Sequence, residues 1–165
     1  MPRQMLMSLF HAMLQSKISY LIHVWYNCTR ALSDQVQIVQ NAALRAIFSL
    51  DRRSARVDMF RDVAKGVLPV QGMREQAVQR FVYTAQKSEI YTNLRFELGS
   101  GQNARRNKHL VVPRVHSQLG ESSMSHLGPK VFNKLPLNVR DSCNLKAFKS
   151  GCREEYRNRI EEWVH

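Results

Sequence analysis

The acidic residues of this 165-residue chain do not gather into a metal-dependent catalytic centre. Enzymes that transfer phosphoryl or nucleotidyl groups hold divalent metal ions between paired carboxylates. Asp58 and Asp62 stand four residues apart, but arginines surround them, so charge pairing along a helix explains them better. The sequence also has no glycine-rich phosphate loop and no nucleophile elbow. We therefore expect no catalytic residues in this chain.

Histidine and cysteine residues are more frequent in the second half, but their spacing does not fit a zinc site. His109, His116, His126, Cys143 and Cys152 are widely separated, and no Cys-x₂-Cys pair occurs among them. The total of three cysteines is odd, which excludes a disulfide framework and favours a reducing, intracellular compartment. We expect no metal and no cofactor.

Basic residues give the strongest chemical signal. The chain has 25 Lys and Arg against 13 Asp and Glu, a formal net charge of +12 and a pI of about 10.2. Residues 99–140 hold seven basic side chains and one acid, so they contribute +6, half of the net charge. A surplus of this size favours a polyanionic partner, and nucleic acid is the first expectation.

The candidate phosphate contacts are spread over both halves of the chain. Arg105, Arg106 and Lys108 form a short arginine-rich stretch, for which a solvated linker is the alternative interpretation. We expect contacts to phosphates, which give affinity without sequence specificity, and not to bases. The full set of candidates is Lys17, Arg45, Arg52, Arg53, Arg105, Arg106, Lys108, Arg114, Lys130 and Lys134.

Apolar periodicity predicts a mainly α-helical fold that begins with a helical bundle over residues 1–97. The first helix is expected over 4–26, with a break near Gln15 and Ser16. Ser33 is the expected N-cap of a second helix that ends near Ser49. Ser54 is expected to cap a third helix that Gly66 terminates, and a fourth runs from Pro69 to about residue 97.

The second half is expected to be less regular. A basic flexible arm covers 98–126, with one short strand at 109–112, and a Gly-Pro turn and C-terminal helix cover 127–165. Residues 130–134 are expected to form a turn or a single helical turn, and the last helix to begin near Asn144. Gly151 should weaken that helix by about 1 kcal/mol relative to alanine.

Two apolar helix faces suggest contacts with other proteins. One face of the last helix carries Leu145, Phe148, Cys152, Tyr156 and Trp163, and an interaction module that uses this face is the alternative function. The stripe of Phe10, Leu14, Leu21 and Trp25 is expected to be partly uncovered and to favour self-association. The longest apolar run, residues 18–25, falls short of the ~20 residues of a membrane span, so we expect no membrane partner.

Five segments resemble, in order, the region that follows the polymerase core in reverse transcriptases of non-LTR, jockey-like retrotransposons. The segment SLFHAMLQSKISY followed by VW resembles the family's "lf..ll.s.lsY…vW" stretch, and VQNAALRAI resembles its "lQn.alR.i" helix. Of the remaining three segments, GVLPV resembles the family's "gilpl" turn. LGPKVFNKLP with Val139 and Arg140 resembles its "GpklwN.LP..iR" segment. Leu145 with Phe148 and Lys149 resembles the "sl..FK..l" start of its terminal helix. Together they span residues 8–149.

The resemblance implies a helical thumb and post-thumb region, whose partners are RNA or DNA in the nucleus or in a cytoplasmic ribonucleoprotein. The family's fingers and palm, with their aromatic-x-Asp-Asp turn, would lie before Met1, and no Asp-Asp pair occurs in the sequence. We therefore expect a truncated, catalytically silent fragment of an RNA-directed DNA polymerase that keeps nonspecific affinity for the nucleic-acid backbone.

Overall fold

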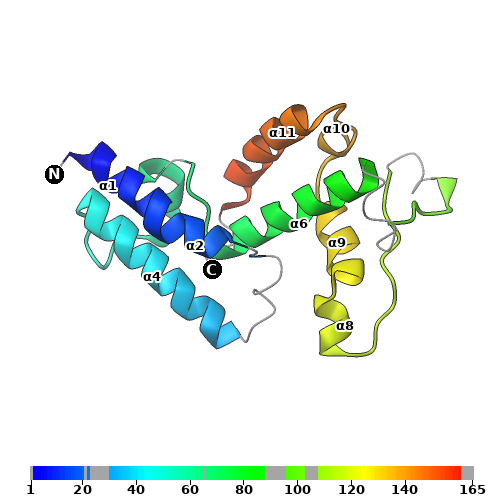
Figure 1. The fold of residues 1–165 in the computed structure, drawn as a ribbon, viewed down its shortest axis with the longest axis horizontal. Coiled ribbons are helices and arrows are strands. Elements are labelled where there is room, and N and C mark those ends of the chain that lie inside the picture. Colours follow the sequence, from blue (N-terminus) through cyan, green and yellow to red (C-terminus); the bar gives the residue numbers. More distant parts are fainter. Residues whose placement is uncertain are drawn as a thin grey trace. The chain divides into compact units, whose positions relative to one another are not determined.

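The structure, a computed structural model, describes residues 2–20, 22, 30–64, 66–87, 96–102 and 108–160. Helices dominate these ranges, which confirms the mainly α-helical prediction (Figure 1). The predicted strand at 109–112 is not formed there, and an isolated antiparallel bridge pairs Leu98 with Leu110. The chain divides into two compact units, Met1–Arg74 with Tyr156–His165, and Glu75–Glu155. We call them unit 1 and unit 2; the boundary expected at residue 97 falls inside unit 2.

Unit 1 begins with one continuous helical segment. It comprises α1 (Arg3–Leu9), the π-helical turn η1 (Phe10–Gln15) and α2 (Ser16–Ser19), and it ends at Tyr20, which has ψ 114°. The predicted break near Gln15 and Ser16 is wrong, because both residues are helical and the Ser16 hydroxyl donates to the Ala12 carbonyl within the helix (2.5 Å). Most of 21–29 lies outside the described residues.

Helix α4 (Arg30–Phe48) starts earlier than predicted. Ser33 lies inside it, buried at 8% exposure, so its predicted role as N-cap is wrong. The helix extends upstream because arginine, alanine and leucine are strong helix formers. Its end is as predicted: Ser49 adopts the left-handed φ of 53°, and the Leu50 N–H donates to the Arg45 carbonyl (3.0 Å), as in a Schellman motif.

A short helical segment, α5 (Arg56–Asp58) and η2 (Met59–Val63), completes the first half. Its N-cap is Ala55, without a side-chain bond, so the predicted Ser54 cap is wrong. Ser54 instead closes a turn, because its N–H donates to the Asp51 carbonyl (3.1 Å). Gly66 has a φ of 95°, as a left-handed stop requires. The core of unit 1 consists of Phe10, Leu44, Met59, Phe60, Ala64, Val67 and Ile160.

Helix α6 (Val70–Lys87) begins directly after Pro69, as predicted. Its first N–H groups find partners nearby: Val70 donates to Gln37 Oε1 (2.8 Å) and Met73 donates to the Pro69 carbonyl (2.9 Å). The helix does not reach residue 97, where the Glu97 carbonyl accepts from the Val111 N–H in the Leu98–Leu110 bridge (2.8 Å).

The predicted basic arm contains helical structure. Helix α8 (Gln118–Ser122) is capped by the Ser117 hydroxyl, which accepts from the Gly120 N–H (3.1 Å). Residues 130–134, expected as a turn or a single helical turn, include the last three residues of a longer helix, α9 (Met124–Phe132). This helix starts upstream because Ser123 is extended and its carbonyl accepts from the Leu127 N–H (2.8 Å).

The last elements are α10 (Leu137–Arg140) and α11 (Leu145–Asn158). Asn144 Oδ1 accepts from the Ala147 N–H (2.8 Å), so the predicted start of the last helix is confirmed. The Phe148 ring stacks on Tyr83, with centroids 4.2 Å apart, and on Phe132, at 6.2 Å. These rings fix which face of α11 is buried and which is left to solvent.

Candidate nucleic-acid interface

A stripe of four cations runs along the solvent-facing side of α11. Lys146, Arg153 and Arg157 are exposed and Lys149 is half-buried. Their spacing of three, four and four residues places them within about 80° of arc, over about 16 Å of helix length. None of the four takes part in a side-chain hydrogen bond or ion pair within the described ranges. We call these residues the α11 stripe.

The two acids of α11 lie outside this arc. Glu154 and Glu155 point about one quarter and one half of a turn away from the stripe, at 3.6 residues per turn. Each neighbouring pair within the stripe therefore brings together like charges, which destabilises a helix by about 0.2–0.5 kcal/mol per pair. Charge pairing within the stripe therefore does not stabilise α11, whereas a polyanion would turn the repulsion into attraction.

The buried face of α11 sets the orientation of the stripe. Phe148, Cys152 and Tyr156 are each at most 1% exposed, and the Asn144 cap fixes the first turn. Around the helix these side chains lie between Glu155 and Lys149, so they flank the stripe on one side. They are covered within the chain, so the described part of α11 exposes no large apolar side chain along its middle, and Leu145, at its first turn, is 39% exposed. Trp163 lies outside the described residues.

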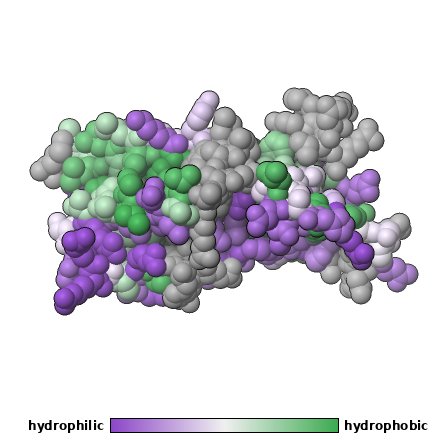
Figure 2. All heavy atoms as spheres, turned by 90° about the horizontal axis from the view of Figure 1, so that it is seen from below, coloured by the Kyte–Doolittle hydropathy of each residue, from purple (hydrophilic) through white to green (hydrophobic). Residues whose placement is uncertain are grey.

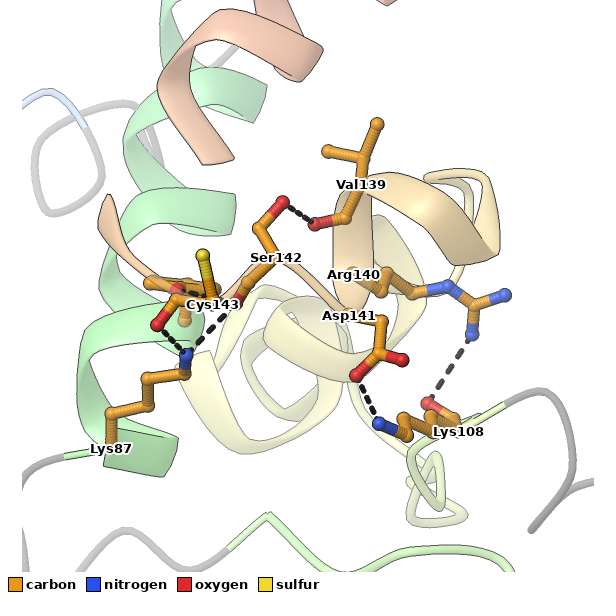
Figure 3. Close-up of polar contacts among 8 residues, drawn as sticks. Lys87, Lys108, Val139, Arg140, Asp141, Ser142 and Cys143 are labelled. Carbon is orange, nitrogen blue, oxygen red and sulfur yellow. Dashed lines mark hydrogen bonds and ion pairs between the residues drawn. The ribbon is translucent and has the colours of Figure 1, made fainter. Parts of the chain in front are cut away.

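Basic side chains at the base of α11 are used in the fold. Figure 3 shows Lys87 Nζ donating to the carbonyls of Ser142 and Cys143, both at 2.9 Å. The Lys108 ammonium pairs with the Asp141 carboxylate, and Arg140 Nη1 donates to the Lys108 carbonyl (3.2 Å). Burial lowers the pKa of Arg140 from its ordinary value.

In unit 1 the structure brings three of the four sequence-predicted cations to one loop. Arg45 is half-buried, and its Nη2 donates to the Ser54 carbonyl (3.3 Å), so it holds the loop that carries Arg52 and Arg53. Both of these loop arginines are exposed. Lys17, on α2, is exposed as well. Arg45 is therefore tied to the fold, whereas the other three remain open to a ligand.

In unit 2 the predicted cations differ in availability. Lys108 is paired with Asp141, and Lys134 Nζ lies 3.2 Å from Glu75 Oε1. The Glu75 side chain is only 6% exposed, so Lys134 neutralises a buried carboxylate. Lys130 and Arg114 are exposed, and Arg105 and Arg106 lie outside the described residues.

Sequence reasoning missed the α11 stripe. The spacing of Lys146, Lys149, Arg153 and Arg157 was visible in the sequence. The apolar periodicity of the same helix instead predicted a protein-binding face, and the charge density of residues 99–140 placed most of the phosphate contacts there. The burial pattern of the folded chain was needed to show that these four cations are accessible and lie apart from the acids of α11.

Other kinds of site find no support among the described residues. No group of three or more histidine, cysteine, aspartate or glutamate side chains there is placed to hold a metal ion. No described helix is long and apolar enough to cross a membrane. Neither Cys143, which is exposed, nor Cys152, which is buried, forms a disulfide.

No protein-family model matches the sequence, and no curated protein or solved structure is detectably similar to the chain. The likeness to the reverse-transcriptase region therefore stays a prediction that depends on the five segments alone.

Proposed function

We propose that this protein binds the phosphodiester backbone of RNA or DNA without sequence specificity, and that the α11 stripe makes the principal contact. The observation that carries the proposal is the segregation of four unpaired cations on one face of a helix whose acids point elsewhere. Lysine and arginine on such a face bind phosphates and release condensed counterions.

The net charge of +12 supports the same function, because it attracts polyanions to the whole molecule before they dock. Exposed Lys17, Arg52, Arg53, Arg114 and Lys130 are proposed as additional phosphate contacts. The role is the one expected of a catalytically silent part of a retrotransposon polymerase, and the resemblance of the five segments to the thumb and post-thumb region is consistent with it.

Neutralising the α11 stripe tests the proposal. In the triple variant Lys146→Gln, Lys149→Gln, Arg153→Gln, we expect affinity for a mixed-sequence oligonucleotide to fall at least tenfold at low salt. Each lost phosphate contact should reduce the slope of log K against log salt by about 0.9 on duplex DNA and about 0.7 on single strands. Fluorescence anisotropy over a salt series measures both quantities, and the slope should change by about 2.

A matched control separates the stripe from the general positive charge. The triple variant Arg3→Gln, Arg56→Gln, Arg80→Gln removes the same charge from exposed residues on three different helices. We expect its slope to change by less than about 1. Equal losses in both variants would show that diffuse charge, and not the α11 stripe, binds the ligand, and a flat salt dependence of the native chain would exclude backbone binding altogether.

A further inference from the structure

Helix α4 carries apolar side chains on its solvent side, whereas amide side chains share its inner side with apolar residues such as Leu44. Leu32, Ile38 and Val39 are 51%, 64% and 52% exposed, and Ala42 and Ala46 are exposed too. Gln40 and Asn41 are buried instead. A surface helix ordinarily exposes polar residues and turns its apolar stripe toward the core, so the apolar solvent side of α4 departs from the usual pattern. Figure 2 shows apolar surface gathered over the part of the molecule that contains α1 and α4.

Hydrogen bonds of the inner side hold α4 in this rotation. Gln37 Nε2 donates to Gln40 Oε1 (2.9 Å) and to Asn41 Oδ1 (2.8 Å), and Gln40 Nε2 donates to the Leu68 carbonyl (2.9 Å). Gln37 Oε1 also accepts the first N–H of α6, from Val70. Turning the apolar side inward would strand these amides, and each unsatisfied buried group costs about 1–3 kcal/mol.

The exposed side of α4 has the spacing of a helix-pairing surface. Leu32, Gln35, Val39, Ala42 and Ala46 follow one another at three, four, three and four residues, which is the heptad seam of paired helices. The seam covers about 21 Å, at 1.5 Å per residue. Its two alanines allow a second helix to approach closely. A surface of this pattern fits another helix with the same pattern.

The charges on this side of α4 select the partner. In a molecule of net charge +12, the seam itself contains no charged residue, so pairing there brings no like charges into direct contact. Asp34 and half-buried Arg45, whose Nη2 also donates to the Ser54 carbonyl, lie on the same flank of the seam, eleven residues or about 16 Å apart. An antiparallel second copy brings this flank of each chain together, with Asp34 of one toward Arg45 of the other, whereas a parallel copy places the two flanks on opposite sides of the pair.

We propose that the exposed face of α4 binds the same face of a second copy of this chain, with the two helices antiparallel. Such an isologous pair has twofold symmetry and buries the same residues in both copies. The inference is independent of the proposed nucleic-acid binding, because it depends on α4 and not on α11. The two also respond oppositely to salt: screening weakens phosphate contacts but favours the approach of two chains of like charge.

Sedimentation of the full chain over a wide concentration range tests the proposal. We expect the mass to rise from that of one 19.2 kDa chain to twice that value, at lower concentration in high salt than in low salt. Val39→Glu should abolish the dimer even though it lowers the net charge, which by itself would favour association. Circular dichroism should show an unchanged fold, because Val39 is exposed.

Met13→Glu is the matched control, because Met13 is 63% exposed on η1 and lies outside the seam. This variant should dimerise like the native chain. The orientation is tested by mixing Leu32→Cys and Ala46→Cys chains in a Cys28→Ser, Cys143→Ser background, where crosslinks between the two variants should exceed those within either. A monomer at all concentrations, a dimer that survives Val39→Glu, or a majority of crosslinks within one variant would overturn the proposal.

Discussion

Replacing Asn133 with alanine is expected to destabilise the protein by about 2–4 kcal/mol. Asn133 pairs with both backbone groups of Leu110: its Oδ1 accepts from the Leu110 N–H (2.9 Å) and its Nδ2 donates to the Leu110 carbonyl (2.8 Å). Leu110 is 3% exposed, so alanine leaves a donor and an acceptor buried without partners. Each costs about 1–3 kcal/mol. Urea unfolding measures the loss.

The Asn133 amide substitutes for a neighbouring strand. On the opposite edge of this segment, the His109 carbonyl accepts from the Gly99 N–H (2.9 Å) and the Val111 N–H donates to Glu97. Asn138→Ala on α10 is the control, because Asn138 is exposed, and its stability should change by less than about 0.5 kcal/mol. The Leu110 amide should exchange hydrogen much faster in Asn133→Ala alone, and unchanged exchange would contradict the assignment.

Gly151→Ala is expected to destabilise the protein by about 1–2 kcal/mol, although alanine in a helix ordinarily gains about 1 kcal/mol over glycine. A Cβ at Gly151 would lie 2.9 Å from Val139 Cγ2 and 3.3 Å from Val139 Cγ1. Valine has little rotamer freedom with which to move away, and overpacking of this kind costs about 1–3 kcal/mol. Thermal or urea unfolding measures the change.

A double-mutant cycle identifies the cause. Val139→Ala leaves a cavity and destabilises by itself, but combined with Gly151→Ala it should recover the helix propensity, with a coupling of about 1 kcal/mol or more. Ser150→Ala, on the exposed neighbour in the same helix, should leave stability unchanged or raise it slightly. Additive effects of the two core substitutions would show that Gly151 does not need to be small.

Asn133 and Gly151 also show which contacts could not be predicted from the sequence. Gly151 was predicted as a weak point of the last helix, because a helical pattern gives the cost of glycine but not the proximity of Val139. Asn133 was noted only as part of the LGPKVFNKLP segment, and its pairing with Leu110 could not be predicted, because the partner lies 23 residues away and the pairing exists only once the chain has folded. The start of that helix near Asn144, by contrast, was predicted correctly from the apolar periodicity that follows it, and in the structure the Asn144 side chain caps it.

Helix α4 shows a different reason for error. Its existence and its end at Ser49 follow from local sequence, but the face that it buries does not. Gln37, Gln40 and Asn41 point inward because the start of α6 and the Leu68 carbonyl need their amides. Phe10 was predicted to be partly uncovered and is 4% exposed, since η1 packs it into the core of unit 1.

The candidate site was also predicted only in part from the sequence. Charge counting predicted a polyanion partner, but it favoured residues 99–140, where Lys108 and Lys134 are paired with acids in the folded chain. The unpaired cations of the α11 stripe lie just beyond that range. Their availability is a property of burial and pairing, which a count of charges along the sequence does not contain.

Lysine footprinting tests the central claim most directly, because one experiment compares the α11 stripe with the lysines predicted from sequence. The full chain is acetylated with and without a saturating single-stranded RNA or duplex DNA, and each lysine is quantified by mass spectrometry. We expect Lys146 and Lys149 to lose reactivity several-fold on binding, more than Lys17, Lys108 or Lys134. Unchanged reactivity at Lys146 and Lys149, with protection elsewhere, would contradict the assignment of the backbone contact to α11.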